Sequence, residues 1–240
     1  MKHKKETKND EVDFLVEAKK FAEAWPKIMS KRNYFTANQL CFLFIEKYKI
    51  NLNNYRDKQD DNANKLFIIL IFFKGLQECS ELAKLTKYRL WHKDNKLVEK
   101  IWRIKCNCKE RLEFVSADIQ GVIIEGRLKM LHELENFFVE NFGKGMYLSP
   151  GLIADKYICS ICKKDTRSCC HISGRIYKGQ ICYSQPVNER IDHVALVREP
   201  KDPRCRIWPW NIKENKDGEG VILDNSILLT SCSVDDFLRE

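Results

Sequence analysis

The chain has 240 residues, of which 44% are hydrophobic and 32% charged, a balance that supplies a folded core and excludes a wholly disordered protein. Its longest apolar run, Leu66–Phe73, is far shorter than the roughly 20 residues that a membrane-spanning helix requires. The net charge of +8 is unevenly distributed, because residues 156–216 carry 13 Lys/Arg against 6 Asp/Glu, whereas residues 217–240 carry 6 acidic side chains and one arginine. The basic region indicates either an anionic partner or the mostly charged surface of a small lobe that has little core.

The N-terminus and the cysteines indicate a cellular compartment. The basic start of the chain is followed by Asn9, Asp10 and Glu11 rather than by an apolar segment, so it does not resemble a secretory signal. The 11 cysteines are an odd number in a chain that is not small, which favours reduced thiols over a disulfide framework. We therefore expect a cytoplasmic protein in a reducing environment, without membrane association.

Three helices are predicted in the first 91 residues. Apolar side chains recur at helical spacing over residues 10–30, where Pro26 is expected to interrupt or kink the helix. Thr36, with Gln39 three residues later, forms a capping-box pattern that predicts the start of the second helix. A polar stretch over residues 51–64 then separates this helix from a long apolar one that runs to about Trp91.

The pattern changes near residue 100. Trp102, Ile104, Cys106 and Cys108 alternate with polar residues, and this alternation predicts a half-buried strand within a small β-hairpin near residues 100–116. In such a strand Cys106 and Cys108 share the inward face. We interpret them as packing residues, because structural zinc ligands usually come in pairs separated by two residues.

The remainder of the chain is predicted to be one helix followed by β-structure. An apolar stripe from Ile124 to Phe142 indicates a helix that ends at Gly143, and a strand is predicted over residues 191–197. We place the domain boundary between residues 150 and 151. The predicted fold class is α+β, with a mostly helical N-terminal unit, residues 1–150, and a zinc-stapled, β-rich C-terminal unit, residues 151–240.

The segment from Cys159 to Cys182 concentrates metal-ligand chemistry. Cys159 and Cys162 form a Cys-x2-Cys pair that can direct two thiolates at one ion, and Cys169 with His171 can complete a tetrahedron. Two alternatives stay open at this point, since Cys170 could replace Cys169, and Cys182 could replace His171 if the intervening hairpin folds back. That hairpin is predicted at Lys178-Gly179, a two-residue turn with glycine where a positive φ is needed.

At the level of this segment alone, residues 159–182 resemble small zinc-finger modules of the knuckle or treble-clef kind. The resemblance covers about a tenth of the chain and implies a folded lobe held by zinc, without implying an activity. Cys170-His171-Ile172 also bears a superficial likeness to the Asp-His-Ile stretch of histidine-metal nucleases, but the acidic residue before the histidine is missing.

A second candidate site follows the predicted strand. Arg204, Arg206, Trp208 and Trp210 would share one face of an extended segment. Guanidinium groups beside indoles suit a phosphate backbone with stacked bases, and they suit cation–π packing within a domain equally well. We therefore consider these four residues as a nucleic-acid-binding face.

The sequence favours a non-enzymatic function. Four protein ligands would leave zinc no open position for catalysis, and we assign no catalytic residues. The leading hypothesis is an adaptor or accessory subunit that docks on another protein or on nucleic acid through its basic C-terminal face. The alternative is a hydrolytic enzyme, nuclease-like or protease-like, in a setting such as cellular defence or a mobile element.

Overall fold

The protein folds into two compact units, seen in a computed structural model that describes residues 6–58, 60, 62–119, 121–214, 221–223 and 234–238. The first, the helical unit, comprises residues 1–128, 172–182 and 234–240, and the second, the β unit, comprises residues 129–171 and 183–233. Both units are discontinuous in sequence, whereas the sequence pattern suggests a single division at residue 150. The predicted α+β class, mostly helical in its N-terminal part, is confirmed.

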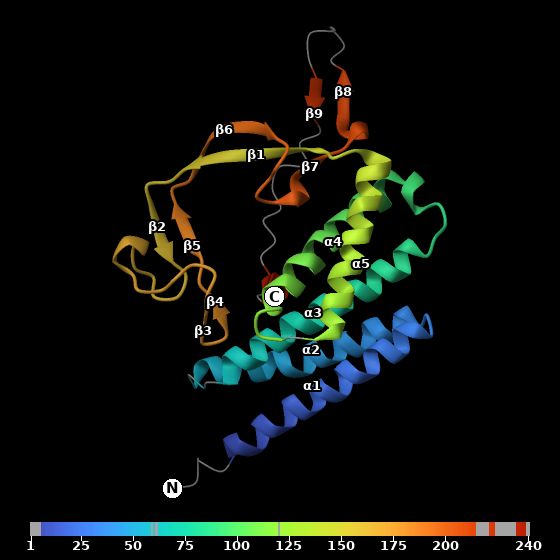
Figure 1. The fold of residues 1–240 in the computed structure, drawn as a ribbon. Coiled ribbons are helices and arrows are strands. Elements are labelled where there is room, and N and C mark those ends of the chain that lie inside the picture. The colour runs from blue at the N-terminus through green and yellow to red at the C-terminus, as the bar shows by residue number, and fades with distance from the viewer. Residues whose placement is uncertain are drawn as a thin grey trace. The chain divides into compact units, whose positions relative to one another are not determined.

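The helical unit is built from long helices (Figure 1). These helices bury aromatic side chains. Phe44 and Phe73 have ring centroids 4.2 Å apart, and the ring of Phe21 lies 5.6 Å from Phe44. Trp25 donates a buried hydrogen bond to the hydroxyl of Ser80. These contacts join the first three helices of the chain, which are α1 (Glu6–Ser30), α2 (Tyr34–Asp57) and α3 (Asn62–Thr86).

Helix α1 continues through Pro26 to Ser30, so the proline does not interrupt it. The expected start of α2 at Thr36 is wrong. The cap of α2 is Asn33, whose side chain accepts a hydrogen bond from the backbone N–H of Thr36. Asparagine is a better cap than threonine, and because it lies three residues earlier the helix begins three residues sooner, at Tyr34.

The predicted hairpin near residues 100–116 is also wrong, because this segment is helix α4 (Asn95–Val115). Asp94 caps the helix by accepting from the backbone N–H of Leu97. Cys108 belongs to a longer series of buried positions separated alternately by three and four residues, namely Val98, Ile101, Lys105, Cys108, Leu112 and Val115, and Trp102 and Cys106 are buried beside this series. That spacing is helical and places Cys108 in the core against α3.

Helices α3 and α4 approach closely at a glycine. A Cβ atom at Gly75 would lie 2.8 Å from a methyl carbon of Leu112. Beside this contact the thiol of Cys108 lies 3.2 Å from the thiol of Cys79. Both cysteines are fully buried, so they pack the interface between the two helices, as the sequence suggested for Cys108.

The predicted turn at Lys178-Gly179 is confirmed, and it belongs to the helical unit. Strands β3 (Ile176–Tyr177) and β4 (Gln180–Ile181) pair across it, and both turn residues have positive φ, at 50° and 70°. The backbone N–H of Gly179 donates to the side chain of Asn64 at 2.7 Å, and its carbonyl accepts from Arg56 at 3.0 Å. The turn is therefore hydrogen-bonded to residues of α2 and α3.

The β unit consists of short antiparallel ladders (Figure 1). The central strand β1 (Met146–Ile153) pairs with β6 (Arg190–Val197) on one side and with β7 (Arg206–Ile207) on the other. Strand β6 corresponds to the strand predicted over residues 191–197. Two further pairs are β2 (Lys156–Cys159) with β5 (Ser184–Val187) and β8 (Ile212–Glu214) with β9 (Val221–Leu223).

Helix α5 (Val122–Phe142) begins in the helical unit and ends in the β unit. Ile124, Leu131 and Phe138 are buried along the stripe predicted for it, and Gly143 follows its last residue with a φ of 73°. No helix among the residues described above combines the length and the apolar content needed to span a membrane.

Candidate metal centre

Four side chains of the β unit form a group that could hold a metal ion. The ligand atoms of Cys159, Cys162, Cys169 and His171 all lie within 4.8 Å of one another. The sulfur of Cys162 is 3.3 Å from the sulfur of Cys169, which in turn is 3.3 Å from Nδ1 of His171. The structure thus brings together the four residues that the sequence placed first.

A tight turn after β2 presents the first pair of thiols. The backbone N–H of Cys159 donates to the carbonyl of Lys164, and the N–H of Lys163 donates to the carbonyl of Cys159, both at 2.9 Å. Lys163 has a φ of 61°, the left-handed conformation that reverses the chain. Within this turn the N–H of Ile161 donates to the sulfur of Cys159 at 3.4 Å.

A short 3₁₀ helix, η2 (Thr166–Ser168), leads to the second pair. Asp165 caps it by accepting from the backbone N–H of Arg167, and the Arg167 side chain holds the pKa of this carboxyl at about 2. The chain then extends through Cys169, so that the N–H of His171 donates to the sulfur of Cys169 at 3.2 Å. Both halves of the site therefore direct a backbone N–H at a candidate ligand sulfur.

Strand pairing fixes the turn to the rest of the β unit. Cys159 pairs with Ser184 at the end of the β2–β5 ladder. Ser160 extends this contact, because its N–H donates to the carbonyl of Tyr183 and its hydroxyl accepts from the N–H of Tyr183 at 2.8 Å. Cys159 is consequently buried, whereas Cys162, Cys169 and His171 are half-buried.

The electrostatics of the group favour a bound cation. The backbone hydrogen bond from His171 lowers the pKa of Cys169, but burial and the neighbouring thiols of Cys162 and Cys159 raise it to about 11. Several thiolates can be held this close together at neutral pH only when positive charge lies between them. A metal ion at the centre of the group would supply that charge.

The dimensions and donor types fit zinc. A tetrahedral zinc ion binds thiolate sulfur at about 2.3 Å, which separates neighbouring sulfurs by about 3.8 Å. The 3.3 Å between Cys162 and Cys169 and the 4.8 Å limit on all the ligand separations lie on either side of that value, which is consistent with zinc. Three thiols and one imidazole are also among the donor sets of structural zinc sites, and four protein ligands complete the tetrahedron.

The two alternative ligands are not in the group of four. Cys170 is exposed and follows Cys169 directly. Cys182 is buried in the helical unit, where its N–H donates to the carbonyl of Arg175 and its carbonyl accepts from the N–H of Gly174. These contacts close the base of the β3–β4 hairpin.

The nucleic-acid-binding face predicted around residue 206 is instead a packed cluster. Arg206 is buried, and its guanidinium donates to the carbonyls of Phe142 and Gly143 at 3.0 and 2.7 Å. It also lies 4.5 Å from the ring centroid of Trp208, itself buried, and Trp208 stacks on Trp210 at 5.2 Å. A cation is favourable at the carbonyl end of a helix, where the backbone carries partial negative charge. Arg206 therefore links the end of α5 to this aromatic cluster.

Arg204 has a local structural contact too. Its Nε donates to the carboxylate of Asp202 at 2.7 Å, and only 7% of its side chain is exposed. The alternation of arginine and tryptophan therefore reflects cation–π and helix-end packing, the second of the two interpretations that the residues allow. The segment alternates between the 3₁₀ helices η3 (Pro203–Cys205) and η4 (Pro209–Asn211), with β7 between them.

Sequence reasoning missed the residues that support the metal group. Asp165 and Ser160 hold the two halves of the site by hydrogen bonds to backbone N–H groups. A local signal exists for Asp165, because an aspartate side chain commonly accepts a hydrogen bond from the backbone N–H two residues later, an arrangement known as an Asx turn. The contact of Ser160 with Tyr183 joins distant parts of the sequence and has no local signal.

Comparison with known proteins identifies no relative. No protein-family model, curated protein or solved structure matches this chain.

Proposed function

We propose that Cys159, Cys162, Cys169 and His171 bind one zinc ion that stabilises the β unit. The observation that carries this proposal is the convergence of three thiols and one imidazole within 4.8 Å. Burial of a cation among these donors offsets the mutual repulsion of the thiolates and releases their protons. A reduced, cytoplasmic location goes with the proposal, because zinc–thiolate sites require reduced cysteines.

The zinc is proposed to be structural. Four protein ligands leave no coordination position for water or substrate, which favours a structural site over a catalytic one. The ladder that carries Cys159 has only four residues in each strand, so a metal ion is a substantial part of what holds the local chain in place. The likeness to zinc-knuckle modules supports the same conclusion.

The function that this site supports best is a zinc-stapled adaptor or accessory subunit. Its contact surface is proposed to be the basic loop of the metal group, defined by Lys163, Lys164 and Arg167. All three side chains are exposed, that of Arg167 by 83%. Exposed cations on this loop can contact an acidic protein surface or a phosphate backbone. We propose these three residues as the contact surface instead of Arg206 and Trp208, because those two side chains are buried and cannot contact a partner directly.

Elemental analysis of protein purified without chelator tests the metal assignment. We expect one zinc ion per chain, and less than about half an equivalent would contradict the proposal. Substituting cobalt for zinc provides a second readout, because tetrahedral cobalt bound to thiolates has characteristic visible and near-ultraviolet absorption bands. An octahedral cobalt spectrum would contradict the proposed ligand set.

Titration against labelled single-stranded and double-stranded oligonucleotides tests the contact surface. If a phosphate backbone is the partner, affinity falls steeply with salt, and replacing Lys163 and Lys164 with Ala reduces the slope of log affinity against log salt by roughly 0.7–0.9 per lost contact. Matched replacement of Lys201, exposed and outside the basic loop, should leave the slope unchanged. A zinc-loaded protein with no salt-sensitive binding would restrict the proposal to a protein partner.

A further inference from the structure

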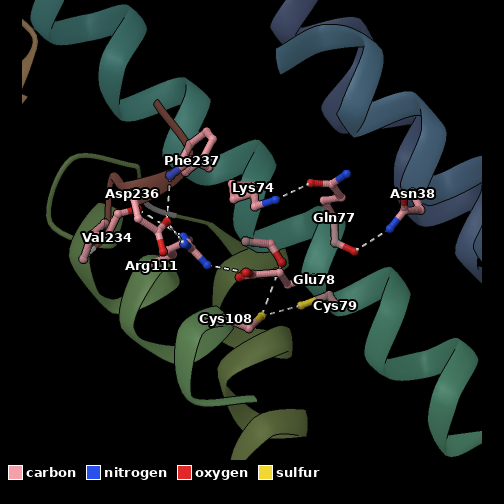
Figure 2. A network of polar contacts seen from close by, with 11 residues as sticks. Asn38, Lys74, Gln77, Glu78, Cys79, Cys108, Arg111, Val234, Asp236 and Phe237 are labelled. Carbon is pink, nitrogen blue, oxygen red and sulfur yellow. Dashed lines mark hydrogen bonds and ion pairs between the residues drawn. The ribbon is translucent and has the colours of Figure 1, made fainter. Parts of the chain in front are cut away.

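The segment Val234–Leu238 packs within the helical unit although it follows the β unit in sequence. It includes the 3₁₀ helix η6 (Asp236–Leu238), and its two apolar ends, Val234 and Leu238, are buried with exposed fractions of 9% and 6%. Figure 2 shows its polar groups against α3 and α4. We refer to the surface that contacts it as the segment site.

Arg111 of α4 is the centre of the segment site. One terminal nitrogen pairs with Glu78 of α3, and the other donates to the carboxylate of Asp236 at 2.6 Å (Figure 2). Its Nε donates to the backbone carbonyl of Val234 at 3.0 Å. The guanidinium thus engages a main-chain oxygen and a side-chain carboxylate two residues apart, and its planar fork makes this a selective contact.

Glu78 keeps Arg111 in this orientation. Burial raises the pKa of Glu78, while the charge of Arg111 opposes that rise. Burial likewise disfavours the charge of Arg111, and the carboxylates of Glu78 and Asp236 more than compensate, so the pKa of Arg111 stays above its usual value. A buried arginine held by one internal carboxylate and facing a second carboxylate is arranged to receive an acidic group.

Three further contacts involve Phe237, the residue after Asp236. Lys49 of α2 donates to the carbonyl of Phe237 at 3.1 Å. The ring of Phe237 is near two cations, with Lys74 and Arg111 each 5.5 Å from its centroid. The segment therefore presents an acid and an aromatic ring to the basic side chains of the site, and the aliphatic residues at its two ends are buried.

Charge complementarity extends beyond the direct contacts. The basic side chains Lys49, Lys74 and Arg111 line the site. Burial lowers the pKa of Arg56, and the negative charge of Asp235 partly opposes this lowering. The occupying segment belongs to the most acidic stretch of the chain, residues 217–240. Charge matching combined with the burial of apolar residues is typical of short peptides recognised by a folded surface.

We propose that the segment site is a peptide-binding site for the pattern aliphatic-acidic-Asp-aromatic-aliphatic, which the chain's own residues Val234–Leu238 occupy. The same pattern on another molecule binds there by exchanging with the resident segment. The partner is thus a peptide segment with an acidic residue directly before an aromatic one. This inference does not depend on metal binding, because all the contacts lie within the helical unit.

A fluorescent peptide of residues 233–240, Ser-Val-Asp-Asp-Phe-Leu-Arg-Glu, tests the proposal with full-length protein. Asp236→Asn combined with Phe237→Ala weakens the resident segment and frees the site. This variant should bind the peptide saturably and at least tenfold more tightly than the unaltered chain, whose own segment competes at an effective concentration on the order of millimolar. A peptide carrying the same two substitutions should bind at least tenfold more weakly.

Variants of the site itself locate the binding. Adding Lys49→Met to the freed variant should weaken the peptide roughly tenfold, since it removes a charged donor to the segment backbone. Adding Lys58→Met, at an exposed lysine just beyond the same helix, should have no effect. An equal response to both changes would overturn the assignment.

Two other results would overturn the proposal. One is the absence of saturable binding to the freed variant while its helical circular dichroism is intact. The other is equally tight binding to the unaltered chain, which would place the peptide elsewhere. If the double substitution reduces the helical signal, Phe237→Ala alone keeps Asp236 on Arg111, and the same tenfold criterion is applied to that variant.

Discussion

At the residue scale, Cys169 and Cys170 offer a matched pair, because they are adjacent and differ in their place relative to the metal group. Cys169 lies 3.3 Å from both Cys162 and His171, whereas Cys170 is exposed. Cys169→Ser should therefore lose most of the bound zinc, and Cys170→Ser should retain one equivalent. Metal content after gel filtration distinguishes the two variants. Equal zinc loss in both would show that the ligand set includes Cys170.

The same group predicts how zinc affinity depends on pH. The pKa of Cys169 is raised to about 11, so the thiol is protonated at neutral pH and zinc must displace its proton. Binding should tighten as pH rises and weaken as it falls, by roughly tenfold per pH unit for each proton displaced. Competition with a chromophoric chelator at about pH 6 and about pH 8 measures this slope. A pH-independent affinity, after correction for the chelator, would contradict thiol ligation.

At the element scale, the β3–β4 turn is positioned by one glycine. Gly179 has a φ of 70°, and a Cβ atom there would lie 2.9 Å from Leu52 and 3.0 Å from the carbonyl of Ala63. Gly179→Ala should lower the free energy of unfolding of the helical unit by about 1–3 kcal/mol. Gly126→Ala is the control, because nothing lies within 4 Å of its Cβ position and α5 should gain about 0.5–1 kcal/mol. Chemical denaturation followed by circular dichroism compares the two, and equal midpoints would argue against a constrained turn.

Local patterns in the sequence identify the elements whose signals are short-range. Cys-x2-Cys with Cys-x-His indicates the metal group, and Lys178-Gly179 indicates the turn, because a few adjacent residues determine each of them. Helix α4 was missed since the alternation of residues 102–108 fits a strand, and only the full spacing from Val98 to Val115 shows the helical period. Asp94 as an N-cap was a usable additional signal.

Long-range contacts have no comparable signal in a single sequence. The pairing of Arg111 with Asp236 joins residues 125 positions apart, and neither residue's neighbours indicate the other. Arg206 likewise depends on the carbonyl end of α5, 63 and 64 positions earlier. A sequence pattern of arginine and tryptophan therefore indicates which interactions are possible. Tertiary packing decides whether the arginine contacts a phosphate or the carbonyl end of a helix.

At the scale of the whole molecule, zinc removal should affect the two units differently. The four candidate ligands belong to the β unit, whereas α1 to α4 belong to the helical unit and bury their own aromatic core. Chelation should therefore abolish a thermal transition of the β unit while most of the helical circular dichroism persists. Calorimetry with and without chelator provides the measurement. Loss of the helical signal together with zinc would contradict this separation.

The interleaving of the two units limits how this protein can be rearranged by recombination. The chain leaves the helical unit after Leu128, returns at Ile172, leaves again after Cys182 and returns at Val234. A single breakpoint near residue 150 would part the helices from the hairpin that carries Gly179 and from the segment that meets Arg111. Neither unit can be transferred to another gene by one crossover, so we expect the two to be inherited together as one indivisible piece of sequence.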